Sequence, residues 1–307
     1  MRKPYIAVVG SINLDLVIRC EALPQAGETL FGSDLTECYG GKGANQAVAA
    51  ARAGSDVLMI GRVGDDAFGA RLRDNLKREG IGCQEVTTVP GPSGFAMIAV
   101  DAQGDNSILV VPGANAALKP ENVFAAEAHI AECDLVVLQL ECPQETVLAA
   151  VEVAKRNRIP VLLDPAPAPN KFSSKLLEVD WICPNESEAA RLTGRPVSDQ
   201  RTAEAASVML HEAGAKHVVI TRGPEGSLHY DGESFKHIPA PKVDCVDSTA
   251  AGDAFAGALS FALAADFGVD EALEFACSAG ALACTNLGAQ AAIPRHDQIA
   301  ARMQLGD

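Results

Sequence analysis

The stretch from Asp247 to Ala258 reads DSTAAGDAFAGA, and the interpretation of the chain depends on it. Asp253 opens a run rich in Ala and Gly, which predicts the start of a helix. The free N–H groups of a first helical turn, together with the helix dipole, attract an anion. A carboxylate beside them can take a proton from a hydroxyl while the N–H groups hold a phosphoryl group. A simple N-capping Asp fits the same pattern, so the stretch alone leaves both interpretations open.

Short apolar segments alternate with helical segments on both sides of this stretch. We expect strands over 6–9, 57–60, 135–140, 161–163, 181–183 and 217–221, and helices over 44–53, 66–79, 145–156, 186–193, 202–213, 252–265 and 271–287. This alternation predicts an α/β fold with a mostly parallel sheet covered on both faces. Two segments of small-β character, roughly 12–38 and 88–112, are expected to form a lid beside that body. The second contains a hairpin signature, in which 95–100 and 107–111 flank a turn over 101–105.

Composition limits the class of protein. The 307 residues are 48% hydrophobic and 21% charged, which is typical of a globular chain. A net charge of −15 disfavours general binding to nucleic acid or to a membrane surface. The nine cysteines include no C-x-x-C pair and suit a reducing cytosol. The longest nearly apolar stretch, 254–265, is shorter than the ~20 residues of a membrane span, so we expect a cytoplasmic protein.

Two N-terminal motifs carry further polar groups. Asn13 and Asp15 lie two residues apart on an extended segment, so both side chains face one way and can bind the hydroxyls of a polyol. A turn pair that satisfies its own backbone is the alternative. Gly40-Gly41-Lys42-Gly43 places several N–H groups at the start of a helix. It is not a P-loop, because Gly43 replaces the Ser or Thr that binds magnesium, and a tight turn is the alternative.

Several motifs in order resemble the PfkB/ribokinase family of sugar kinases. They are GSINLD at 10–15, GGKGANQ at 40–46, PGANAAL at 112–118, QLECP at 139–143, DPAPA at 164–168, PNESEA at 184–189, DSTAAGDAFAG at 247–257 and GAQ at 288–290. The similarity runs from Val8 to about Pro294. It implies one kinase domain over 1–307, a three-layer α/β sandwich with a mostly parallel central sheet and a small β-sheet lid.

The resemblance also implies an activity. We expect ATP-dependent phosphorylation of a small sugar, with D-ribose and its 5-hydroxyl as the first choice. Deoxyribose, another sugar or a nucleoside is the alternative substrate. A catalytically silent sugar sensor on the same fold is a different class of function, and the intact Asp253, Asn185 and Glu188 argue against it. Glycoside hydrolysis would need two facing carboxylates and no nucleotide loop.

The resemblance assigns roles to individual residues. The catalytic base is Asp253, beside anion-hole N–H groups supplied by Ala250, Ala251 and Gly252. The sugar-binding residues are Asn13, Asp15, Gly41, Lys42, Gly43, Asn45, Glu141 and Asp253. Asn185 and Glu188 organise Mg²⁺ and the phosphates of ATP. The nucleotide-binding residues are Asn185, Glu188, Thr221, Arg222, Gly223, Pro224, Glu225, Gly226, Gly252 and Cys277; members of the family often carry a polar residue or His at the position of Cys277.

Two further properties follow from the same resemblance. An activating K⁺ would be bound by Asp247, Thr249, Ala283, Asn286, Gly288 and Ala292, although Ala292 stands where a Ser hydroxyl often contributes. An Asp247 that only caps its turn is the alternative. The lid is expected to close over the sugar and to pair with the lid of a second subunit in a homodimer.

Overall fold

The computed structural model describes residues 2–103 and 105–304. Within these residues, nine strands form the main sheet in the order β13-β12-β11-β10-β9-β8-β1-β4-β5. Their bounds are β1 Tyr5–Val9, β4 Asp56–Gly64, β5 Gly82–Val89, β8 Leu135–Leu138, β9 Val161–Leu163, β10 Trp181–Ile182, β11 His217–Thr221, β12 Ser227–Tyr230 and β13 Phe235–Ile238. The pairs from β11 to β5 are parallel, whereas β12 and β13 add an antiparallel end. The predicted α/β fold with a mostly parallel sheet is confirmed.

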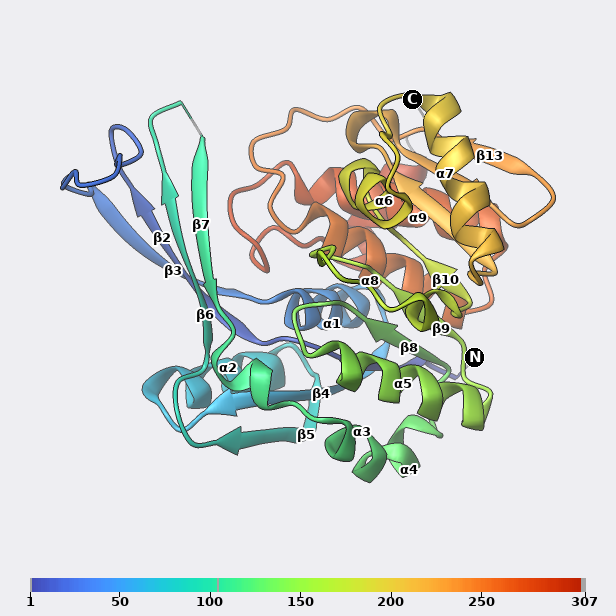
Figure 1. Cartoon of the computed structure of the whole chain (residues 1–307), viewed down its shortest axis with the longest axis horizontal. Helices are drawn as coiled ribbons and strands as arrows, with labels where there is room; N and C mark the ends of the chain where they lie inside the picture. Colours follow the sequence, from blue (N-terminus) through green and yellow to red (C-terminus); the bar gives the residue numbers. More distant parts are fainter. Residues whose placement is uncertain (1, 104, 305–307) are drawn as a thin grey trace.

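Helices cover both faces of this sheet and make three layers (Figure 1). Alternate residues of β1 enter two separate cores, Ile6 and Val8 on one face and Ala7 and Val9 on the other. The first face is covered by α1 Lys42–Ala53, α2 Ala67–Arg78, α8 Ala251–Ala264, α9 Val269–Ala283 and α10 His296–Gln304. The second is covered by α3 Pro120–Ala125, α4 Glu127–Ile130, α5 Gln144–Asn157, α6 Glu186–Thr193 and α7 Gln200–Glu212.

A second, smaller sheet projects from one side of the body (Figure 1). Its order is β3-β2-β6-β7, with β2 Asn13–Arg19, β3 Asp34–Gly40, β6 Gly94–Val100 and β7 Asn106–Val111. In register, Asn13 lies opposite Gly40 on one side and Gly94 on the other. The edge strand β7 is exposed along its whole length and carries Ile108, Leu109 and Val110 on its surface.

Several elements differ from the sequence expectation. The helix predicted over 271–287 ends at Ala283, because the chain turns at Cys284 to bond the loop before α8. The strand predicted over 135–140 ends at Leu138; Gln139, which follows it, belongs to the site, whereas Leu140 is buried in the apolar core. The strands β5, β12 and β13 and the helices α3, α4 and α10 were not predicted: β13 is mostly exposed, β12 is a buried strand of only four residues with two polar side chains, and the others lack a continuous apolar pattern. Gly104, within the predicted turn over 101–105, lies outside the described residues. In the described chain, no helix has the length and apolarity to cross a membrane.

Candidate active site

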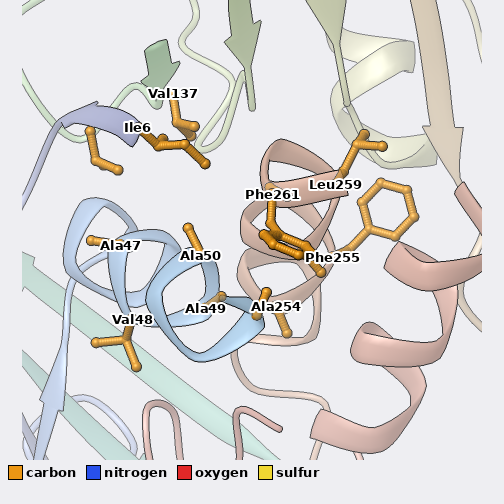
Figure 2. Packing of buried hydrophobic residues seen from close by; sticks show 14 of the residues in the cluster. Ile6, Ala47, Val48, Ala49, Ala50, Val137, Ala254, Phe255, Leu259 and Phe261 are labelled. Carbon is orange, nitrogen blue, oxygen red and sulfur yellow. The ribbon is translucent and has the colours of Figure 1, made fainter. Parts of the chain in front are cut away.

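The site begins with an unusually close approach of α1 and α8. Ala49 of α1 points towards Ala254 of α8 (Figure 2). A Cβ added at Gly257 would overlap the Cβ of Ala49 and lie 2.7 Å from the carbonyl oxygen of Gln46. Gly257 follows Asp253 by one helical turn and therefore lies on the same face of α8. Its missing side chain lets the polar start of α1 reach the first turn of α8.

Asp253 is held by two amide side chains from α1. It is buried, and Nδ2 of Asn45 donates to its Oδ2 at 2.9 Å while Nε2 of Gln46 donates to its Oδ1 at 3.1 Å. Neither contact comes from the residues next to Asp253, so the carboxylate does not act as a simple N-cap. The structure thus favours a chemical use of Asp253 over the capping alternative.

Free N–H groups lie beside this carboxylate. Ala250 adopts the left-handed conformation, with φ 60°, and the helix starts directly after it. The N–H of Ala251 donates to the Ser248 carbonyl, whereas those of Gly252 and Asp253 find no acceptor in the described chain. A Cβ added at Gly252 would meet no atom within 4 Å. The first turn of α8 therefore offers N–H donors to an open space, which is the geometry of an anion hole.

A second cluster of polar residues lies at the carboxyl end of β1. Oε2 of Glu141 accepts from the Ser11 hydroxyl at 2.6 Å and from the backbone N–H of Lys42 at 3.0 Å. Gly41 has φ 86°, and an added Cβ would lie 2.7 Å from the backbone nitrogen of Asn13. Only Gly fits this turn, so Gly41 brings the start of α1 against β2.

Asn13 and Asp15 enter the site from β2. Nδ2 of Asn115 donates to Oδ1 of Asn13 at 2.7 Å, and the same Asn115 accepts from the N–H of Ile12 at 2.9 Å. The carboxylate of Asp15 occupies the space that a side chain at Gly40 would fill. Neither side chain forms a hydrogen bond with the backbone of its own turn within the described chain, so the alternative interpretation as a turn pair does not hold. Oδ1 of Asn45 is buried and has no partner among the described residues.

The charges of the site are concentrated. Burial, followed by the nearby charges of Glu141 and Asp253, raises the pKa of Asp15 to about 7. Burial also raises the pKa of Asp164 to about 7; Lys42 and a hydrogen bond from Gln46 oppose this rise. Burial opposes the charge of Lys42, but Asp253, Asp164 and Glu141 together hold its pKa above the usual value. One ammonium group therefore lies among several carboxylates, a pattern that favours a functional site.

The residues assigned to the nucleotide lie at the end of β11. Asn185 and Glu188 cap α6 reciprocally, with Oδ1 of Asn185 accepting from the Glu188 N–H and Oε2 of Glu188 accepting from the Asn185 N–H, both at 2.9 Å. Asn185 also bridges Thr221 of β11. The guanidinium of Arg222 is buried between Glu186, at 3.1 Å, and Glu225, at 2.6 Å. This pairing ties the loop from Gly223 to Gly226 to the start of α6.

Cys277 lies deeper than the other nucleotide residues. It lies on the buried face of α9, and its Sγ lies 3.3 Å from the Ser227 hydroxyl. Burial raises the pKa of its thiol to about 11, so it stays protonated near neutral pH. The structure places it directly behind the loop that ends at Gly226, with little surface left for a base to contact.

The loop before α8 meets the end of α9. Oδ1 of Asp247 accepts from the Thr249 N–H and Oδ2 from the Gly288 N–H, both at 2.9 Å. The N–H groups of Val246 and Asp247 both donate to the Cys284 carbonyl. The carbonyls of Thr249, Ala283, Asn286 and Ala292 accept no hydrogen bond from the described chain. Asp247 thus joins two loops instead of capping its own turn alone.

Sequence reasoning left five polar residues of the site without a role. They are Ser11, Gln46, Asn115, Gln139 and Asp164. All five lie inside the motifs GSINLD, GGKGANQ, PGANAAL, QLECP and DPAPA, so the motifs carried the signal. Their tasks depend on contacts between distant segments, which no local pattern displays.

Comparison with known proteins places this geometry in context. The model of the pfkB family of carbohydrate kinases matches residues 3–296. A ribokinase from Haemophilus influenzae is 40% identical over 299 residues, 97% of each chain. A deoxyribokinase from Salmonella typhi is 39% identical over 304 residues, 98% of this chain and 99% of the relative. The solved structure of Arabidopsis thaliana ribokinase complexed with ribose and ATP is 31% identical, with a TM-score of 0.92 and 99% of each chain covered.

Proposed function

The chain belongs to the pfkB family of carbohydrate kinases, and on that basis we propose that it transfers the γ-phosphoryl group of ATP to the 5-hydroxyl of D-ribose. The single observation that carries this proposal is the pairing of a buried carboxylate with free N–H groups on one helical turn. Asp253 directly follows Gly252, whose N–H has no acceptor in the described chain and whose Cβ position is open. The ribokinases among the relatives support ribose as the acceptor.

We assign Asp253 as the general base. A sugar hydroxyl is a poor nucleophile near neutral pH, so an acceptor for its proton must lie at the attacking oxygen. Asn45 and Gln46 hold the two carboxylate oxygens and so fix the direction from which the hydroxyl can approach. In this proposal the anion hole is formed by the turn of Ala250, Ala251 and Gly252: the N–H of Gly252 is free for the negative charge of the transferring phosphoryl group, whereas that of Ala251 would first have to leave the Ser248 carbonyl.

The sugar is proposed to lie between β2 and the start of α1. Asp15, Asn13 and Glu141 supply acceptors for hydroxyl groups, and the unpartnered Oδ1 of Asn45 supplies another. The Lys42 side chain and the N–H of Gly41 are donors at the same place, whereas the N–H of Gly43 donates to the Ser11 hydroxyl at 3.2 Å and helps to hold this turn. A ribose bound there would present its 5-hydroxyl to Asp253 across the turn of α8.

The nucleotide is proposed to lie over the loop from Thr221 to Gly226, with Pro224 and Glu225 at its tip. The start of α6 then faces the phosphates. Oε2 of Glu188 is occupied by the Asn185 N–H, but its other oxygen accepts no hydrogen bond from the described chain, so it fits Mg²⁺ or its water ligands. Mg²⁺ bound with ATP neutralises part of the phosphate charge. Cys277 would contribute packing behind the base.

An activating K⁺ is proposed beside the anion hole. Across the described chain, no three His, Cys, Asp or Glu side chains gather to hold a metal. A cation at Asp247 would therefore take most of its ligands from carbonyls, and those of Thr249, Ala283, Asn286 and Ala292 are free to bind one. The carboxylate of Asp247 is already oriented, because the N–H of Thr249 donates to its Oδ1 and the N–H of Gly288 donates to its Oδ2. Such an ion would hold the loop that precedes Ala250 in one conformation.

The small sheet is proposed to act as a lid and as a dimer surface. It is formed by the two segments, about 12–38 and 88–112, that leave the α/β body. Its edge strand β7 exposes Ile108, Leu109 and Val110, and an apolar edge of this kind is usually covered. Pairing with the lid of a second copy would cover it, and closure would keep water away from the phosphoryl group.

An ADP-release assay across pentoses, hexoses and nucleosides tests the proposed function. We expect the highest kcat/KM with D-ribose, no turnover without Mg²⁺, and a 5-phosphate product by NMR. The deoxyribokinase relatives make 2-deoxyribose the second candidate. A higher kcat/KM for 2-deoxyribose would replace ribose as the substrate, and turnover of neither sugar would contradict the proposal.

A further inference from the structure

Two buried glutamines lie behind the base, and the mechanism above gives neither a complete task. Gln46 is fully buried in α1, and Gln139 is buried directly after β8. Nε2 of Gln46 donates to Oδ2 of Asp164 at 2.7 Å and to Oδ1 of Asp253 at 3.1 Å. Its Oε1 accepts from Nε2 of Gln139 at 2.6 Å. One amide group therefore joins two carboxylates that come from different strands and helices.

The direction of this chain of bonds is determined by chemistry. An amide nitrogen only donates and an amide oxygen only accepts, while an ionised carboxylate only accepts. Nε2 of Gln46 must therefore face the two carboxylates, and its oxygen must face a donor. Gln139 is that donor, and this orientation leaves its own Oε1 buried without a partner among the described residues.

The unpartnered Oε1 of Gln139 is a loss of stability that accompanies this arrangement. A buried acceptor without a partner lowers stability. Turning the Gln139 amide over would place its oxygen against the oxygen of Gln46, so that two acceptors would face each other without a donor. Gly10 provides the space, because a side chain there would overlap Oε1 of Gln139. The chain therefore keeps an unsatisfied group in order to hold Gln46 in one orientation.

We propose that Gln46 is a positioning residue that aims the Asp253 carboxylate at the acceptor hydroxyl and links it to Asp164, and that Gln139 locks Gln46 in this orientation. The inference rests on the proposed kinase function. Gln46 itself touches no reacting atom. Its effect is to hold one oxygen of the base, so that the other lone pairs meet the substrate.

Several charged groups surround the Asp253 carboxylate. Lys42 from α1, Asp15 from β2 and Asp164 after β9 all face Asp253. An N–H donor stabilises the ionised form of a carboxylate. Removing the Gln46 donor therefore takes away one of the two hydrogen bonds that fix the orientation of the Asp253 carboxylate.

The test uses Gln46→Met and Gln139→Met, which keep side-chain length and remove the donors. For Gln46→Met we expect kcat to fall about 10–100-fold, with the KM for ATP within about twofold. Gln139→Met should move the same quantities in the same direction by a smaller factor. Asn157→Ala, which removes a half-buried amide bonded to Glu127 at the end of α5, is the matched control and should match the wild type.

A second readout does not depend on turnover. ¹³C NMR of labelled Asp carboxyls follows the titration of Asp164, whose pKa of about 7 the Gln46 hydrogen bond holds down. In Gln46→Met that pKa should rise. An unshifted titration of Asp164 together with an unchanged kcat in Gln46→Met would overturn the proposal, and so would a Gln139→Met enzyme with wild-type kcat. Failure of the wild type to phosphorylate any sugar would instead overturn the proposed function. The titration of Asp164 would then still show whether Gln46 bonds that carboxylate.

Discussion

Replacing Gly257 with Ala tests whether the contact between α1 and α8 sets the geometry of the base. The added Cβ would overlap the Cβ of Ala49 and lie 2.7 Å from the carbonyl oxygen of Gln46. An ordinary contact is about 3.5–4.0 Å, so the two helices must separate by about 1 Å. Overpacking of this kind costs about 1–3 kcal/mol of the free energy of unfolding.

The effect on catalysis should exceed the effect on stability. The bonds from Asn45 and Gln46 to Asp253, at 2.9 and 3.1 Å, span the same interface and would lengthen with it. A misplacement of about 1 Å in a catalytic group can cost about 10²-fold in rate. We therefore expect kcat to fall by about that factor in Gly257→Ala while the protein remains folded.

The measurement is kcat by coupled ADP release, with the thermal midpoint followed in parallel. Gly268→Ala is the matched control, because an added Cβ there meets no atom within 4 Å and the residue lies far along the chain from the base. It should retain wild-type kcat and stability. If Gly257→Ala kept wild-type kcat while losing stability, the helix contact would be only a packing feature and the reasoning would be refuted.

Four further outcomes are expected. Asp253→Asn should bind ATP and ribose normally and lower kcat at least ~10²–10⁴-fold, and near wild-type turnover would remove it from the role of base. Asp15→Ala should raise the KM for ribose and leave the KM for ATP unchanged. Because burial, Glu141 and Asp253 raise the pKa of Asp15 to about 7, the wild-type KM for ribose should also fall between pH 6 and 8 as Asp15 ionises. The same fall in Asp15→Asn would mean that another group causes the pH dependence. K⁺ should raise the rate well above that in Na⁺ at equal ionic strength, and Asp247→Ala should blunt the response; equal rates in both salts would mean that no such site operates. Sedimentation should show a homodimer that Leu109→Asp disrupts, whereas a wild-type monomer would contradict pairing through the lid.

The sequence by itself determined the class of fold and the positions of the motifs. Apolar runs such as Val161–Leu163 alternate with helical segments, and that local pattern is enough to predict a mostly parallel sheet. Turns that require Gly, such as Gly41, leave a clear mark in the sequence. Strands with exposed faces, such as Phe235–Ile238, leave no such mark and were missed.

Only the tertiary structure shows which groups each polar residue contacts. An Asp253 that caps its helix and an Asp253 that acts as a base have the same local sequence; the hydrogen bonds to its two oxygens from Asn45 and Gln46, more than 200 positions away, support the proposal that it is the base. Cys277 fits a position beside the nucleotide in sequence, yet its thiol lies against Ser227 in the core. Local patterns follow from the backbone of a few residues, whereas hydrogen bonds between distant segments exist only after the helices have packed.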